Sequence, residues 1–196
     1  MSEEKLIIEK EPISLGSGDI YIEEYAGGEL PALSVLEVDE KKAGHVKDGA
    51  SLAVTETFYV AKSDDDKAVR KKMIGDDYKL NYSDIITNAE TIKRALSTVN
   101  VIDDAERGVQ RLEMGGISNY KSKRYLVLFV NDDKDTRILV MGSNESGLNL
   151  SFLKDKETVN SFSFSAEPLP NGRKAIIEFG KPKATPAPVA EVVNEK

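Results

Sequence analysis

The sequence predicts a mainly β protein: a β-barrel or β-sandwich with one flanking α-helix, a long hairpin extension and terminal arms. Most periodic segments alternate apolar and polar residues with a period of two, which is typical of strands that have one buried face. Only residues 88–98 have the spacing of an amphipathic helix. A short charged stretch, residues 64–74, separates two strand-like segments and indicates an exposed hairpin.

Length and composition fit one folded domain. The chain has 196 residues, and its 40% hydrophobic residues together with 14 glycines come close to the globular average, which excludes global disorder. We predict an N-terminal arm over residues 1–18, a β domain over residues 19–180 and a Pro/Ala-rich tail over residues 181–196. The formal net charge of −7 has the wrong sign for a protein that grips phosphate backbones, so a nucleic-acid-binding domain is not expected.

Several kinds of chemistry are excluded by residue counts. The chain has no cysteine, so a disulfide scaffold, a thiolate metal site and a cysteine nucleophile are all excluded. His45 is its single histidine, which leaves no pair for a zinc site or a proton relay. No apolar run approaches the ~18 residues of a membrane helix, and the acidic N-terminus does not resemble a signal peptide. We therefore expect no stable membrane association and no export from the compartment of synthesis.

The first half of the chain predicts a short strand, a long hairpin and the helix. Residues 20–25 form a β-rich run that ends at Gly27-Gly28. Residues 52–61 and 78–82 alternate, and residues 64–74 between them are too charged and too short to be core. In the helix, Thr87 and Glu90 have capping-box spacing, and the apolar face is expected to cover one opening of the sheet.

The second half predicts more strands. Residues 125–130 are apolar on both faces, so this strand should be covered from two sides. Residues 136–141 should pair with it across a polar connection of hairpin length. We further predict a strand over residues 109–114, a second hairpin that pairs residues 148–152 with residues 162–166, and a last strand over residues 175–179.

Candidate catalytic and metal-binding residues each have a simpler explanation. His45 lies beside Gly44 in a polar turn without a second histidine, and no Gly-x-Ser-x-Gly elbow is present. The acidic pairs lack the twelve-residue calcium-loop pattern, so we interpret them as solvated turns and helix starts. We predict no catalytic residues, no metal site and no cofactor. The pairs are Asp64-Asp65, Asp76-Asp77, Asp103-Asp104 and Asp132-Asp133.

The edges of the predicted sheet leave two arrangements open. A sheet protein with long charged hairpins must either blunt its edge strands or use them. The chain can be an isolated sandwich whose edges are protected by charge, or neighbouring copies can each contribute strands to one closed barrel. The strand at residues 125–130 then receives its second cover from the local helix or from the next subunit.

Several motifs occur together along residues 19–179. They are Asp48-Gly49-Ala50-Ser51-Leu52, Phe58-Tyr59, Gly115-Gly116, residues 124–130, residues 140–142 with Asn144 and Gly147, and residues 150–159. The most specific block is the last one, a strand that runs into Lys-Asp-Lys-Glu-Thr. With these motifs the chain resembles a family, the tube-forming major tail proteins of tailed bacteriophages and of phage-tail-like particles of Gram-positive hosts.

The resemblance implies a non-enzymatic structural protein of the virion tail, made in the bacterial cytoplasm. Six copies would form a ring, and rings would stack into a hollow tube that conducts DNA or punctures a membrane. Its partners would be a baseplate or initiator complex, a terminator, and a sheath protein where the tail is contractile. From the charge of −7 per copy we expect an acidic lumen that DNA passes without specific binding. The hairpin at residues 64–74 and the N-terminal arm are the candidate ring-to-ring contacts.

Two alternatives belong to other classes of protein. A non-catalytic β-sandwich binding module, directed at carbohydrate or protein, would also be all-β and would display exposed aromatic residues in a row. A metal-dependent hydrolase built on the acidic pairs is the weakest of the three hypotheses.

Overall fold

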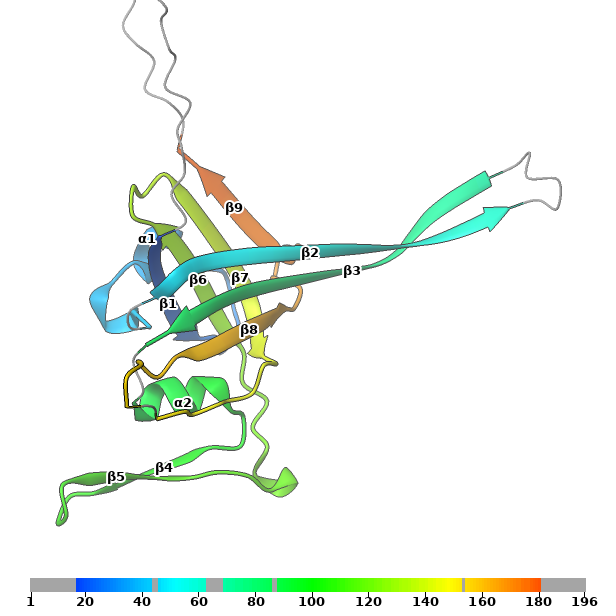
Figure 1. Cartoon of the computed structure of the whole chain (residues 1–196). Coiled ribbons are helices and arrows are strands. Elements are labelled where there is room, and N and C mark those ends of the chain that lie inside the picture. Colours follow the sequence, from blue (N-terminus) through cyan, green and yellow to red (C-terminus); the bar gives the residue numbers. More distant parts are fainter. Residues whose placement is uncertain (1–16, 44–45, 63–68, 86–87, 153, 181–196) are drawn as a thin grey trace, which may run out of the picture.

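The computed structural model describes residues 17–43, 46–62, 69–85, 88–152 and 154–180 of the chain, and it is mainly β, which confirms the predicted fold class (Figure 1). Residues 1–16 of the predicted N-terminal arm and the predicted tail over residues 181–196 lie outside the described residues. The helical elements of the described chain are short. They are α1 (Leu33–Leu36), α2 (Ala89–Ala95) and the 3-10 turns η1 (Asp39–Lys41) and η2 (Ile117–Asn119). The strands are β1 (Gly18–Glu24), β2 (Val46–Lys62), β3 (Val69–Asp84), β4 (Asn100–Asp104), β5 (Val109–Glu113), β6 (Tyr125–Asn131), β7 (Thr136–Asn144), β8 (Asn160–Ala166) and β9 (Ala175–Phe179).

Seven of these strands form one antiparallel sheet that forks at β7. The order is β1-β6-β7-β8-β3-β2, and β9 pairs with residues 136–140 of β7 while β8 pairs with residues 142–144. The sheet curls but is not closed, so the single chain is an open structure rather than a complete barrel. The chain just before β2 lies beside β1, where the Ala43 amide donates to the Ile20 carbonyl at 2.8 Å.

Strand β6, which lies between β1 and β7, is buried along its whole length, as its sequence predicts. One face joins an inner core with Tyr82 and Phe164, whose rings stack at 6.2 Å between centroids. The other face packs against Leu36 of α1 and against Leu169. The second cover therefore comes from this chain itself, so β6 does not need a neighbouring subunit for its burial.

Helix α2 closes one end of the inner core, as predicted, but its limits differ from the prediction. The capping residue is Asn88, whose side-chain oxygen accepts from the Thr91 amide at 2.8 Å, and Thr87 lies outside the described residues. The helix ends at Ala95, three residues earlier than expected, because Leu96 already has extended backbone angles. Ala95 and Leu96 pack against the inner core, and α2 lies next to β8 in Figure 1.

The predicted second hairpin is wrong. Residues 148–152 form no strand, and β8 pairs instead with β3 and β7. The alternation of Leu148, Leu150 and Phe152 does not reflect burial, since Phe152 is 79% exposed. Asn144 occupies the position beside β8 that this strand would have taken: its side-chain oxygen accepts from the Ser163 amide at 2.9 Å.

One strand was not anticipated. β4 pairs with the expected β5 to form a separate two-stranded hairpin, which projects from the body below α2 in Figure 1. Asp103 and Asp104, interpreted above as part of a solvated turn or helix start, are the last residues of β4. Because this hairpin packs little against the core, its residues show no strong alternation that would have predicted it.

The fork at β7 depends on Gly142. A Cβ atom added there would lie 1.8 Å from the Ser165 carbonyl oxygen, whereas one added at Gly75 would meet nothing nearer than the Thr57 Cβ at 4.0 Å. We expect Gly142→Ala to lower the free energy of unfolding by about 1–3 kcal/mol or more, because β7 and β8 must separate. Urea unfolding measures this, and Gly75→Ala, expected within about 0.5 kcal/mol of wild type, is the matched control. Equal effects of the two substitutions would contradict the role given to the fork.

Candidate assembly surface

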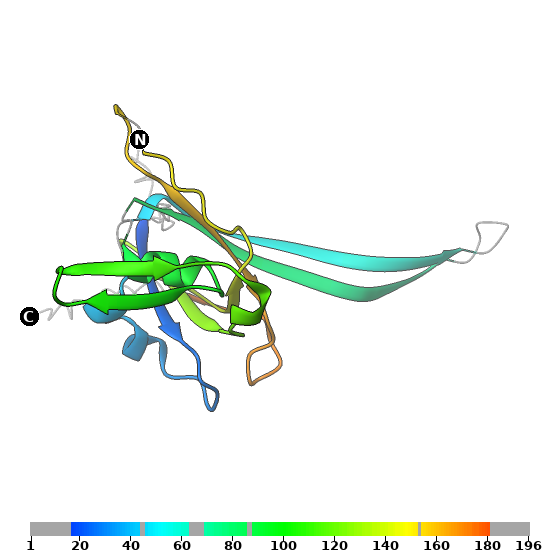
Figure 2. The same ribbon diagram turned by 90° about the horizontal axis from the view of Figure 1, so that it is seen from below.

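The most prominent feature of the molecule is a two-stranded ribbon that leaves the body of the sheet. β8 pairs with β3 only at residues 79–84, so residues 54–62 of β2 and 69–78 of β3 have only each other as partners. Both views show this ribbon projecting away from the body (Figures 1 and 2). It confirms the predicted long hairpin extension, although its turn, residues 63–68, lies outside the described residues.

The ribbon exposes both backbone edges and apolar side chains. Exposed fractions run from 37% at Phe58 to 61% at Ile74, which lies at a bulge opposite the Thr57–Phe58 step. A two-stranded hairpin alone is marginally stable in water, and free strand edges pair readily with other chains. The ribbon therefore has the properties of a surface that another chain covers. Its exposed apolar residues are Val54, Phe58, Tyr59, Val60, Met73 and Ile74.

Charge changes sign along the ribbon. Near the body, Glu56 and Asp76 face each other across the strands, and Lys174 pairs with Asp76 at 2.7 Å. This ion pair ties the base of the ribbon to the body. Further out, β3 carries Arg70, Lys71 and Lys72, and the Lys71 ammonium lies 3.7 Å from the centre of the Phe58 ring.

The polar side of the sheet presents hydroxyl groups rather than charges. Serine side chains from three strands meet here, and the hydroxyl oxygens of Ser83 and Ser161 lie 3.3 Å apart. Lys79 is the charged residue within this group, and its hydrogen bond to Glu145, at 3.0 Å, raises the pKa of the ammonium. We call this group the hydroxyl face; it comprises Ser51, Lys79, Asn81, Ser83, Ser161, Ser163 and Ser165.

The acidic pairs weighed in the sequence do not converge. Asp76 is engaged by Lys174, Asp103 accepts from Gln110 at 2.9 Å, and Asp132-Asp133 lie in the exposed turn after β6. Within the described ranges, no group of three or more metal-binding side chains could hold an ion. His45 and the pair Asp64-Asp65 fall outside those ranges. None of the helices in the described part is long and apolar enough to cross a membrane.

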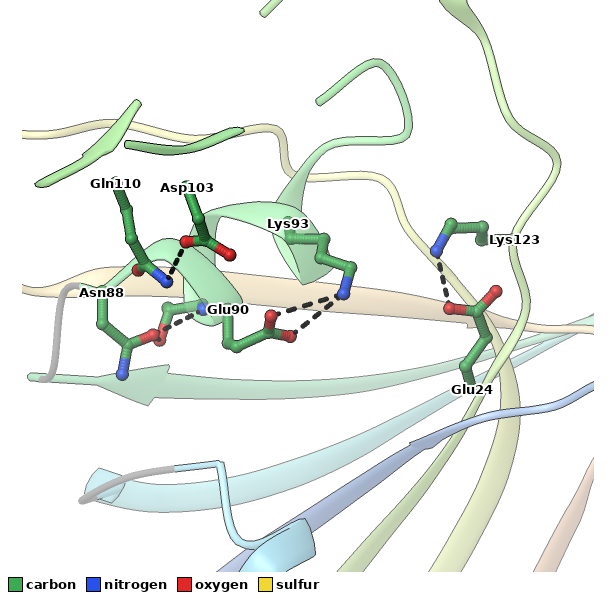
Figure 3. Close-up of polar contacts among 8 residues, drawn as sticks. Glu24, Asn88, Glu90, Lys93, Asp103, Gln110 and Lys123 are labelled. Carbon is green, nitrogen blue, oxygen red and sulfur yellow. Dashed lines mark hydrogen bonds and ion pairs between the residues drawn. The ribbon is translucent and has the colours of Figure 1, made fainter. Parts of the chain in front are cut away.

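A second polar region surrounds α2, and sequence reasoning missed it. Lys93 pairs with Glu90 at 3.3 Å within the helix, and Lys123 pairs with Glu24 at 2.6 Å at the neighbouring strand (Figure 3). Tyr125 lines the same region as Glu24, Glu90 and Lys93. Burial is the main cause that raises the pKa of its phenol to about 12, and the negative charge of Glu24 is the second. No local pattern could have indicated this region, because its residues come from three segments that lie far apart in the sequence, around Glu24, around Glu90 and around Lys123.

The raised pKa of Tyr125 predicts a loss of stability at alkaline pH. Well below pH 10 the phenol is neutral in both the folded and the unfolded chain. As the pH rises from 10 toward 12, the unfolded chain loses this proton while the folded chain keeps it, so the free energy of unfolding should fall. Urea unfolding at several pH values measures the slope. Tyr125→Phe should make it shallower, and identical slopes for the two proteins would contradict the assignment.

Comparison with known proteins gives structural likenesses only. No protein-family model matches the chain, and no curated protein matches it. A chain from the sheath–tube complex of PVC, an extracellular contractile injection system in the extended state, is 10% identical with a TM-score of 0.49, covering 91% of this chain and 99% of that one. A chain from the tube-terminating cap of the anti-feeding prophage is 12% identical with a TM-score of 0.39, covering 67% and 79%.

A third solved structure is the tail of an empty GTA particle with C6 symmetry, which is 8% identical with a TM-score of 0.40 and covers 83% of this chain and 96% of that one. The matched structures are thus components of tail-like tubes and caps. The expectation of a Gram-positive host finds no support among them. With TM-scores below 0.5, these likenesses leave the function to be argued from the chain itself.

Proposed function

We propose that this protein is a non-enzymatic structural subunit that polymerises with copies of itself into hexameric rings, which stack into a tail tube. The observation that carries the proposal is the ribbon. Its free edges and exposed apolar residues are costly on a lone chain and become useful when a second copy covers them.

The geometry of such a contact favours an extended assembly. The ribbon of one copy and the surface that receives it on the next are different parts of the molecule, so the contact is head-to-tail. A head-to-tail contact closes into a ring or continues as a filament, depending on the rotation between neighbours. The number six comes from the family resemblance of the motifs around Asp48-Gly49 and residues 150–159.

The hydroxyl face, with the carboxylates of Asp77, Glu145 and Glu157 at its margin, is our candidate for the wall of the tube. Small neutral side chains offer DNA few sites to grip, and its lysine is already paired with Glu145. Six copies at −7 carry −42 in a ring (6 × −7), although only carboxylates within a Debye length of about 8 Å of the lumen act on DNA. We propose a conduit or puncturing tube with an acidic bore, assembled on an initiator and closed by a terminator, with a sheath protein where the tail is contractile.

The alternative, a non-catalytic binding module, has less support. The exposed aromatic residues Tyr120, Phe152 and Phe179 lie on three separate parts of the chain, not in one row. Specific binding of a glycan or protein ligand by a stable monomer would favour this alternative over polymerisation.

Electron microscopy tests the assembly. The purified full-length chain, alone or with an initiator complex, should form tubes. The double variant Tyr59→Lys with Ile74→Lys should stay folded, because both side chains are exposed, but should form no tubes. Val35→Lys on α1, 55% exposed in the wild type, is the matched control and should assemble normally. Wild-type chains that remain monomeric under both conditions would overturn the proposal.

DNA sedimentation tests the bore. Double-stranded DNA mixed with preformed tubes should stay in the supernatant at about 150 mM salt, because acidic walls repel phosphates. Co-sedimentation that weakens steeply as salt is raised would reveal a basic wall and contradict the acidic-lumen part of the proposal.

A further inference from the structure

A cationic hollow lies at the C-terminal end of α2, apart from the ribbon and the hydroxyl face. Its volume is about 170 Å³, well above the roughly 10–15 Å³ that one water requires. Among the described residues its lining includes three cations, Lys93, Arg94 and Lys123, and no carboxylate, while Glu24 and Glu90 line the adjoining hollow, which shares Lys93, Arg94 and Tyr125. The remaining lining residues are Ala95, Leu96, Ser97, Tyr120, Tyr125, Ser143 and Asn144.

Two groups of this hollow lack partners among the described residues. The Arg94 guanidinium has neither a hydrogen bond nor an ion pair there, whereas Lys93 and Lys123 are held by Glu90 and Glu24. Tyr125 is 6% exposed, and its hydroxyl oxygen is a buried polar atom without a partner in the described part of the chain. Leaving such a donor unsatisfied costs about 1–3 kcal/mol, so a ligand that accepts its hydrogen bond is favoured.

The chemistry of the hollow selects an anion. A planar guanidinium donates two parallel hydrogen bonds to a carboxylate or a phosphate, a phenol adds a third donor, and the two lysines add positive charge. Each chain carries 34 acidic side chains, so neighbouring copies in an assembly supply carboxylates at high local concentration. A carboxylate therefore reaches the hollow more readily than a free phosphate does.

We propose that this hollow binds a carboxylate from the acidic run Asp64-Asp65-Asp66 of a second copy. This run holds three consecutive acidic residues, which no other part of the sequence does, and in chain order it falls between the last residue of β2 and the first residue of β3. In both views the ribbon points away from the body that carries α2, so another copy is the natural recipient (Figures 1 and 2). The inference rests on the proposed self-assembly and names the receiving site.

A double-mutant cycle on full-length chains tests the contact. Arg94→Gln and the triple variant D64N/D65N/D66N should each raise the concentration needed for tube formation about tenfold or more, as expected for a charge-assisted hydrogen bond. Because both remove the same contact, their combination should be no worse than either one, whereas independent sites would give about a hundredfold. Arg107→Gln, at an exposed arginine in the turn between β4 and β5, is the matched control.

Peptide binding gives a readout that does not require assembly. A fluorescent Lys-Ser-Asp-Asp-Asp-Lys-Ala-Val peptide should bind the triple variant saturably, and its three-asparagine counterpart should not. Adding Arg94→Gln to the triple variant should weaken binding about tenfold or more, and Tyr125→Phe a few fold without lowering the melting temperature. Acetate should displace the peptide at lower concentration than phosphate.

The outcomes separate the two proposals. Wild-type chains that never polymerise overturn the proposed function, whereas peptide binding that depends on Arg94 would still support the site. Multiplicative effects in the cycle, binding that ignores Arg94, or displacement by phosphate at far lower concentration than by acetate overturn the inference while tubes still form.

Discussion

Unpaired backbone along the ribbon is the constraint on which the architecture depends. Each residue of β2 and β3 beyond the body has hydrogen-bonding groups that face the partner strand or face solvent, and no third strand follows. Exposed apolar side chains lie along the same length. Water satisfies the polar groups but not the apolar ones, so covering the ribbon with protein lowers its free energy. Natural proteins rarely leave a long apolar edge uncovered, which is why we place the function of this chain at the ribbon.

The body is organised differently, because it completes its own core. β6 is buried on both faces by elements of the same chain: α2 and β8 contribute to one side, and α1 and Leu169 to the other. The Lys174–Asp76 pair then fixes the base of the ribbon to this finished body. The described body therefore needs no contact with another copy to complete its core. A surface that is already ordered loses little conformational entropy when a partner covers it, which favours tight binding.

Sequence periodicity predicted the elements that local burial determines and missed those that distant contacts determine. The two-sided burial of β6 and the apolar face of α2 follow from residues within one segment, so both were predictable. Residues 148–152 have the same alternation, yet Asn144 takes their place beside β8 through a side-chain hydrogen bond. β4 lies almost outside the core and therefore carries no clear pattern. The cationic hollow brings Arg94 of α2 together with Lys123 and Tyr125 from a later segment, and one sequence read alone contains no sign of that proximity.

The cationic hollow also bears on how an acidic chain can assemble at all. Copies with a net charge of −7 repel one another, and this repulsion acts over about 8 Å at physiological salt. A contact that buries carboxylates with no cation beside them would add the free-energy cost of desolvating these groups to the charge repulsion between copies. The hollow is lined by the Arg94 guanidinium, which has no partner among the described residues, and by two ammonium groups that are paired with glutamates, so it attracts a carboxylate locally while the net charge of the chain stays negative. Repulsion elsewhere then disfavours most wrong orientations, so the same charge that opposes assembly also makes the correct contact selective.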